Sequence, residues 1–107
     1  MALQVYDVSI EMVRNLAPVV EMVGRRDRAL ADQMRRAASS VPLNVAEGTE
    51  SLGGNGRARF RTAMGSAAEV GAALDVATAW GYVPRDRAVE VKARLERVRR
   101  MLWPLSR

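Results

Sequence analysis

The stretch Gln33–Gly48 constrains the fold of this chain more than any other, because it combines a helical pattern with an internal proline. Apolar residues recur every three or four positions and form one stripe along a helix, at Leu30, Met34, Ala37, Val41, Val45 and Gly48. Pro42 cannot donate a hydrogen bond to the Ala38 carbonyl, so we expect the helix to bend there. We therefore predict a kinked helix over residues 27–50 that tertiary contacts hold in place.

The same periodicity predicts three further helices. The first spans residues 3–23 and is expected to continue, bent, through Pro18; another spans residues 57–80. The last begins at Pro84 and is expected to stop at Pro104. Segment 51–56 contains three glycines and is typical of a flexible linker. These patterns predict an all-α chain with one domain, residues 1–107, folded as an up-down four-helix bundle.

Composition excludes several classes of site. The chain has neither cysteine nor histidine, which excludes disulfides, the usual zinc sites and the Glu-x-x-His di-iron site of many four-helix bundles. Ser39, Ser40 and Ser66 have no histidine to activate them, so we expect no enzymatic activity, cofactor or metal. No apolar run approaches the roughly 18 residues of a membrane span, and the N-terminal residues lack the plan of a signal peptide. We expect a soluble cytoplasmic protein.

Small residues cover several sides of the helix predicted over residues 57–80. Those that face away from its inward stripe are Gly65, Ala68, Ala72, Ala73 and Ala79. A glycine weakens an exposed helix by roughly 1 kcal/mol relative to alanine, so Gly65 and Gly71 favour close packing over exposure. Close packing on more than one side of a helix in a four-helix subunit indicates a partner subunit, and we therefore expect an oligomer.

Two sequence blocks resemble the signature of a family of small bacterial four-helix-bundle proteins. Block Gln33–Gly48 is similar to the family pattern Gln-Leu-Arg-Arg-Ala-x-x-Ser-Ile-Pro-x-Asn-Ile-Ala-Glu-Gly, with Met34 for Leu and Val for both Ile. A second pattern, Arg-Phe-x-x-Ala-x-Gly-Ser-x-x-Glu, is matched by Arg59, Phe60, Ala63, Gly65, Ser66 and Glu69. The family includes the rRNA intervening-sequence proteins and the accessory variability determinant of diversity-generating retroelements.

The resemblance implies a ring-like homo-oligomer, most simply a homopentamer. The retroelement members bind nucleic acid and a reverse transcriptase, so RNA or DNA and a protein partner of that kind are the partners it implies. Nothing in this sequence selects the retroelement branch.

The motif positions are interpreted as structural or interface residues: Arg35, Arg36, Ser40, Pro42, Asn44, Glu47, Gly65, Ser66 and Glu69. We expect the Asn44 amide to bond backbone freed by Pro42, or a neighbouring subunit. Glu47 and Glu69 are candidates for a carboxylate pair across two helices; the alternative is that Arg35 and Arg36 neutralise them.

The net charge of +5 is uneven, because residues 54–107 hold ten arginines and one lysine against five acids. Arginine binds phosphate in a bidentate manner, and this favours nucleic acid as a ligand. A GC-rich genome would also select arginine codons but does not explain the uneven distribution. The predicted nucleic-acid-binding residues are Arg57, Arg59, Arg61, Arg85, Lys92, Arg94, Arg99 and Arg100.

An oligomeric scaffold that binds a partner protein, with no nucleic-acid role, is the alternative function. Its candidate contact is the C-terminal segment 102–105, which contains Trp103, although we expect this segment to pack in the core. In that case the arginines only form a solvent-exposed helix face and bind no nucleic acid.

Overall fold

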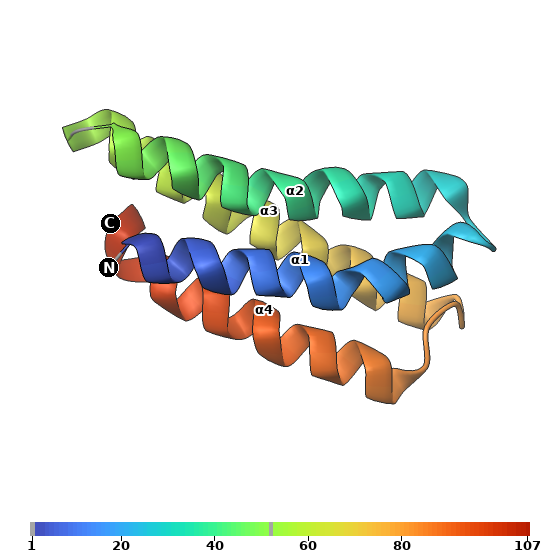
Figure 1. The fold of residues 1–107 in the computed structure, drawn as a ribbon. Coiled ribbons are helices and arrows are strands. Elements are labelled where there is room, and N and C mark those ends of the chain that lie inside the picture. The colour runs from blue at the N-terminus through green and yellow to red at the C-terminus, as the bar shows by residue number, and fades with distance from the viewer. Residues whose placement is uncertain (1, 52) are drawn as a thin grey trace.

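The computed structural model describes residues 2–51 and 53–107, and these residues form four α-helices joined by short turns. In chain order the helices are α1 (Ala2–Gly24), α2 (Arg28–Glu50), α3 (Gly53–Ala79) and α4 (Arg85–Ser106). Each helix packs antiparallel to the next, and α4 returns to contact α1 (Figure 1). The chain termini lie at one end of the bundle, and the α1–α2 and α3–α4 connections lie at the other (Figure 1). The predicted up-down four-helix bundle is confirmed.

The apolar stripes identified in the sequence form the core. All six positions of the α2 stripe are buried. The α4 seam is buried at Ala88, Val91, Leu95, Val98 and Leu102. On α1, Met12, Leu16, Val19 and Val23 are almost completely buried. Hydrophobic burial along four facing stripes is the main favourable term that holds the bundle together.

The first two helices each continue through an internal proline. Helix α1 runs on through Pro18, which is exposed, and α2 runs on through Pro42, which is buried. The N-terminus of α2 is capped by Asp27, whose carboxylate accepts a hydrogen bond of 3.0 Å from the Leu30 amide.

The predicted linker 51–56 is wrong in most of its length, because α3 begins at Gly53. Gly56 is buried, and a Cβ atom there would lie 3.1 Å from the carbonyl oxygens of Gly48 and Ser51. Gly56 therefore permits α2 and α3 to approach closely at this turn, within a helix and not in a flexible loop. Leu52 of the predicted linker lies outside the described residues.

The prediction that Pro104 stops the last helix is also wrong, because α4 extends to Ser106. The final turn gains hydrogen bonds that a free helix end lacks. Arg61 Nε donates to the Ser106 carbonyl at 2.8 Å, and the Ser106 hydroxyl donates to the Trp103 carbonyl at 3.0 Å. These bonds give partners to the Ser106 and Trp103 carbonyls, which a helix C-terminus leaves without intrahelical donors.

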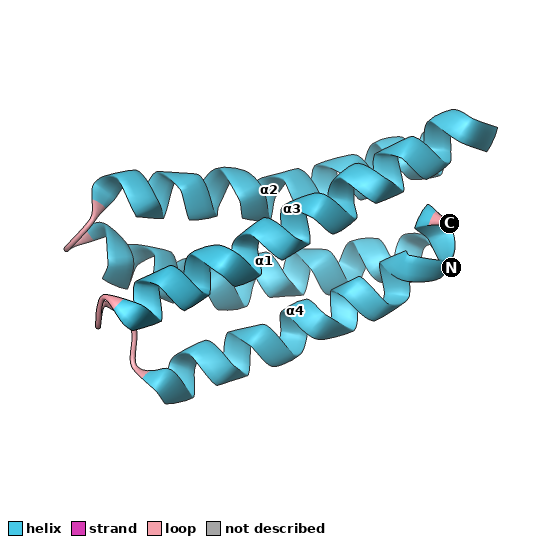
Figure 2. Ribbon diagram, turned by 180° about the vertical axis from the view of Figure 1, so that it is seen from behind, coloured by secondary structure: helices cyan, strands magenta, loops and turns pink. Residues whose placement is uncertain are grey.

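Helix α3 lies between α2 and α4 and presents its outer side to solvent (Figure 2). The small residues predicted away from its inward stripe are exposed at Gly65, Ala68, Ala72 and Ala79. Ala73 is the exception, with 5% exposure, because it lies three residues after Val70 on the buried stripe.

Candidate nucleic-acid interface

The eight cations predicted to bind nucleic acid lie on α3 or α4, but the structure gives them different roles. Arg59 Nε lies 3.1 Å from Glu47 Oε2 and joins α3 to α2. Arg61 is hydrogen-bonded to the end of α4, as described above. Lys92 of α4 pairs with Asp75 of α3. These three cations therefore connect helices within the subunit.

Arg99 forms a fourth interaction, with Glu96 on the same helix, at 3.5 Å. Its side chain is 40% exposed, but its Nε atom is buried and has no hydrogen-bond partner. The guanidinium is thus only partly available to a ligand.

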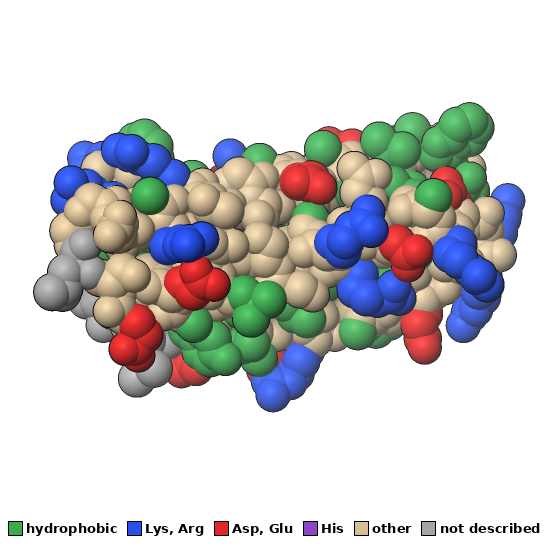
Figure 3. All heavy atoms as spheres, turned by 90° about the horizontal axis from the view of Figure 1, so that it is seen from above, with side chains coloured by type: hydrophobic (Ala, Val, Ile, Leu, Met, Phe, Trp, Pro, Cys, Tyr) green, Lys and Arg blue, Asp and Glu red, His purple; other side chains and the backbone are tan. Residues whose placement is uncertain are grey.

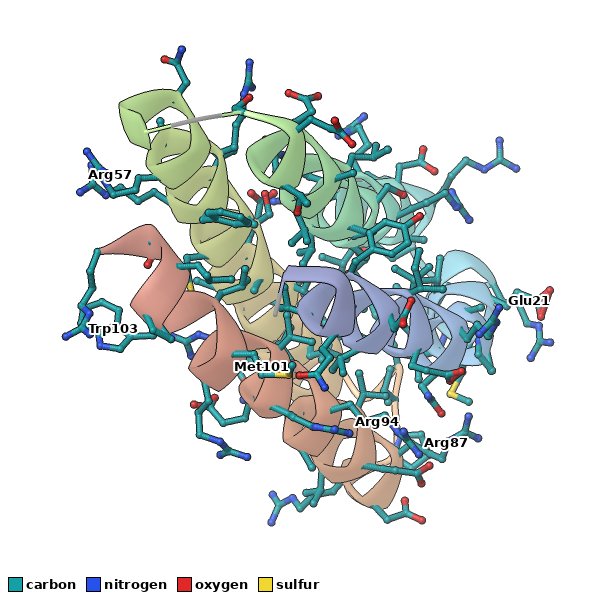
Figure 4. The ribbon with its side chains drawn as sticks, turned by 60° about the vertical axis from the view of Figure 1, so that its left-hand side comes forward. Glu21, Arg57, Arg87, Arg94, Met101 and Trp103 are labelled. Atoms are coloured by element: carbon teal, nitrogen blue, oxygen red, sulfur yellow. The ribbon has the colours of Figure 1, made fainter. Side chains whose placement is uncertain are left out.

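The remaining four, Arg57, Arg85, Arg94 and Arg100, are exposed, and no carboxylate in the described chain lies within ion-pair distance of them. They do not form one patch. Arg57 projects on the same side of the bundle as Trp103, whereas Arg94 lies with Arg87 on another side (Figure 4). Figure 3, which shows the face that α2 lines, likewise has positive and negative side chains interspersed.

Arg94 and Arg100 have different surroundings. Arg94 lines a small cleft of about 160 Å³ between α1 and α4, together with the acids Asp7 and Glu11. Arg100 lines a shallow cleft of about 410 Å³ with Met64, Glu96, Arg99 and Trp103. The second cleft combines cations with an exposed aromatic ring, so it is better suited to a nucleotide.

Trp103 is 58% exposed, so the expectation that it packs in the core is wrong. The buried seam of α4 passes through Leu102, and the next residue therefore points about 100° away from it. Its neighbour Leu105 is half-buried against the core.

Polar residues of the two sequence blocks meet at the α2–α3 interface. Ser66 Oγ donates to Ser40 Oγ at 2.7 Å. Asn44 Nδ2 lies 2.9 Å from both Ser40 Oγ and the Ser40 carbonyl oxygen. All three side chains are half-buried. This polar cluster fixes α2 against α3 and supports the interpretation of these residues as structural.

Two of the alternatives for this region are not realised within the subunit. The Asn44 amide bonds the Ser40 carbonyl and not the Ala38 carbonyl that Pro42 leaves without a donor. The carboxylates of Glu47 and Glu69 do not pair, because Glu47 contacts Arg59, ten residues and about 15 Å before Glu69 along α3.

The arginines proposed to neutralise Glu47 and Glu69 have other surroundings. Arg35 pairs with Asp32 at 2.9 Å. Arg36 is exposed and forms no ion pair with a described carboxylate. The arginine that neutralises Glu47 comes from the second sequence block, and only the packing of α3 on α2 reveals it.

An aromatic cluster that was not predicted from the sequence lies at the end of the bundle with the α1–α2 and α3–α4 connections, here called the loop end. The rings of Trp80 and Tyr82 are nearly parallel, with centroids 6.3 Å apart and an interplanar angle of 16°. The Arg26 guanidinium lies 5.4 Å from the Tyr82 ring centroid. The sequence feature that indicates the aromatic pair is Trp-Gly-Tyr directly after α3. The contact with Arg26 could not be predicted, because it depends on how the α1–α2 and α3–α4 connections pack together.

The described residues show no group of three or more acidic side chains placed to hold a metal ion. None of the helices within residues 2–51 and 53–107 is long and apolar enough to cross a membrane.

Comparison with known proteins identifies relatives of the chain. A family model described as "23S rRNA-intervening sequence protein" matches residues 1–103. The structure is similar to the crystal structure of a protein with unknown function from the S23 ribosomal protein family of Bacteroides thetaiotaomicron. The TM-score is 0.88 at 15% sequence identity, over 96% of this chain and 98% of that chain. At this identity the similarity shows the fold alone. No curated protein matches the chain.

Proposed function

This chain belongs to the 23S rRNA-intervening sequence protein family, and we propose that it is a non-catalytic, cytoplasmic accessory protein that binds RNA or DNA. The binding surface is the α3–α4 side of the bundle, at Arg57, Arg100 and Trp103. The observation that carries this proposal is that both guanidiniums are exposed without a carboxylate within ion-pair distance in the described chain, on the side where Trp103 is exposed.

An unpaired arginine is the better phosphate ligand for a physical reason. Arg59 must first leave Glu47, and Arg61 must first leave the Ser106 carbonyl. Arg57 and Arg100 break no such interaction when they form charge-assisted hydrogen bonds with phosphate oxygens. Trp103 adds a flat apolar surface beside Arg100, on which a base can stack.

We further propose that subunits assemble into a ring-like homopentamer through the outer side of α3. Nothing lies within 4 Å of a Cβ atom built on Gly65, and Ala68, Ala72 and Ala79 are exposed on the same helix. A partner helix could approach this surface closely. Five copies carry a formal charge of about +25, which strengthens the attraction for phosphate.

The proposed ring also gives Pro42 a role. A bend in α2 at Pro42 would adapt that helix to a neighbouring subunit, because proline removes the hydrogen bond to the Ala38 carbonyl.

A second candidate function is a scaffold that binds a partner protein, such as a reverse transcriptase. Two large apolar side chains favour it: Leu43 of α2 is 63% exposed and Val89 of α4 is 62% exposed. They are single residues on separate helices, however, and scattered exposed apolar residues are common on protein surfaces.

Binding of labelled RNA and DNA across a salt series tests the proposal. Phosphate contacts make the logarithm of affinity fall steeply and linearly with the logarithm of salt concentration. We expect Arg57→Glu and Arg100→Glu each to weaken binding. Arg14→Glu is the matched control, since Arg14 is already paired with Glu11 on α1. If neither RNA nor DNA binds at low salt, or if binding does not weaken as salt is added, the proposal is overturned and the scaffold is favoured.

A further inference from the structure

The loop end of the bundle carries an exposed aromatic surface that the bundle itself does not use. Trp80 is 66% exposed, more than any other large apolar side chain that the structure describes. Its neighbour Tyr82 is half-buried and packs against the core, and Val83 is buried. Tyr82 and Val83 therefore hold the α3–α4 connection against the core, while Trp80 faces solvent. A tryptophan that contributes little to the core is a candidate for binding.

Hydrogen bonds at the end of α3 hold this aromatic pair in place. The Gly81 amide bonds the Thr78 carbonyl at 3.0 Å, and the Tyr82 amide bonds the Ala77 carbonyl at 2.9 Å. With Gly81 at φ +79°, this is the Schellman arrangement of a helix C-terminus. Trp80 and Tyr82 thus lie on fixed backbone, and little conformational entropy is lost when a flat ligand stacks on them.

The surroundings of the pair are positively charged. The two connections at this end, residues 24–28 and 80–87, contain five arginines and two aspartates. One aspartate, Asp27, is occupied as the cap of α2. Arg26 lies over the Tyr82 ring, while Arg25, Arg28 and Arg85 are exposed and not paired with any described carboxylate.

We propose that Arg26, Trp80 and Tyr82, here called the loop-end platform, form a second binding site, specific for single-stranded nucleic acid. An unpaired base stacks on Trp80, and Arg25, Arg28 and Arg85 contact the adjoining phosphates. The combination of exposed aromatic rings with arginines is the chemistry by which proteins bind single strands. A duplex does not fit, because its base faces are covered by neighbouring bases except at its ends.

The loop-end platform is separate from the α3–α4 surface, although it rests on the proposed function that this chain binds nucleic acid. Trp80 follows Arg57 by 23 residues along α3, which corresponds to about 34 Å. Substitutions at one site therefore leave the other intact.

Fluorescence of Trp80 tests the proposal directly. The chain has two tryptophans, so the full-length Trp103→Phe variant leaves Trp80 as the sole tryptophan. We expect short single-stranded RNA or DNA oligonucleotides to quench its emission at low salt. An abasic oligonucleotide of the same length, which carries phosphates but no bases, should quench little. A long duplex, in which few base pairs are terminal, should also quench little.

Affinity measurements on substitutions complete the test. We expect Trp80→Ala to weaken single-strand binding roughly five- to 150-fold, the usual range for loss of one stacked base, and Trp80→Phe to restore part of it. Trp103→Ala, the matched loss of an exposed tryptophan at the other end, should leave the quenching of Trp80 by the oligonucleotide in place.

Three results would overturn the loop-end platform. The first is that Trp80→Ala binds single strands as tightly as the parent chain does. The second is that the abasic oligonucleotide quenches Trp80 as strongly as the oligonucleotide with bases. The third is that Trp80→Ala changes the native mass, which would assign Trp80 to a subunit contact. If Arg57→Glu and Arg100→Glu still weaken binding in these cases, the proposed function stands without the platform. If they have no effect while Trp80 is quenched, the platform stands and the α3–α4 surface does not. Absence of any binding at low salt overturns both.

Discussion

The ring of Phe60 in α3 lies directly against Gly48 in α2. A Cβ atom at Gly48 would be 2.9 Å from both Cε1 and Cζ of that ring, closer than such atoms pack. The residues directly before these two, Glu47 and Arg59, form an ion pair, and further along the interface Ser66 bonds Ser40. The two sequence blocks that resemble the family signature are thus the two sides of one interface.

This contact predicts that Gly48→Ala destabilises the subunit. The new methyl group must displace the buried Phe60 ring, and overpacking of this kind costs about 1–3 kcal/mol. Alanine also favours the helix by roughly 1 kcal/mol, and this gain has to be separated from the steric cost. Urea denaturation of the variant and the parent chain measures the net change.

Gly71→Ala is the matched control, because it provides the same helix gain without the clash. A Cβ atom at Gly71 meets only Leu95 Cδ2, at an ordinary 3.4 Å. Gly48→Ala should therefore be less stable than Gly71→Ala by the steric cost of about 1–3 kcal/mol. Equal stability of the two variants would contradict the packing described for Phe60.

The polar cluster makes a second prediction. Ser40→Ala removes the acceptor for both Ser66 and Asn44 Nδ2, and should lower the free energy of unfolding by about 0.5–1.5 kcal/mol. In Ser40→Ala/Ser66→Ala the loss should be smaller than the sum of the single losses, because both remove the same hydrogen bond. Thermal or urea denaturation of the four chains measures this coupling, and additive losses would show that the cluster contributes nothing as a unit.

The helices and the core could be predicted from the sequence because each stripe has a clear period. The α2 and α4 stripes need no knowledge of their neighbours, since any helix with such a stripe must bury it. The turn at 51–56 could not be predicted in this way. Glycines usually indicate a loop, but Gly56 lies in α3, at a position where the carbonyl oxygens of Gly48 and Ser51 leave little room for a side chain.

The candidate site was less predictable, because the availability of a charge depends on tertiary partners. Eight cations look alike in the sequence, yet Arg59 is paired with Glu47, Arg61 with the Ser106 carbonyl, and Lys92 with Asp75. These partners lie 12, 45 and 17 positions away in the chain. Only the packing of the bundle separates them from Arg57 and Arg100, which pair with no carboxylate of the described residues.

A third prediction concerns assembly through the outer side of α3. Gly65→Leu places a large side chain where the subunit leaves open space, so the fold should be retained and the helix should gain up to about 1 kcal/mol. In a subunit interface the same side chain would prevent close approach of a second helix. We expect a native mass of several subunits for the parent chain and a lower mass for Gly65→Leu.

The control for assembly is Gln33→Leu, an equally large apolar side chain at an exposed position of α2. Its mass should match that of the parent chain. A parent chain that is monomeric at high concentration would contradict the proposed ring, whatever the variants do.

The last prediction separates arginines that hold the subunit together from those that bind phosphate. Arg61→Ala removes the hydrogen bond to the Ser106 carbonyl, and should lower the free energy of unfolding by about 1 kcal/mol. It should leave the salt dependence of nucleic-acid binding almost unchanged. Arg100→Ala should do the reverse, because its guanidinium has no protein partner in the described chain. Each phosphate contact that is lost reduces the slope of log affinity against log salt by about 1.

Denaturation curves and binding isotherms on the same two variants provide both measurements. If Arg61→Ala reduced the slope as much as Arg100→Ala did, Arg61 would exchange the Ser106 carbonyl for phosphate, and the assignment of cations to two roles would be wrong.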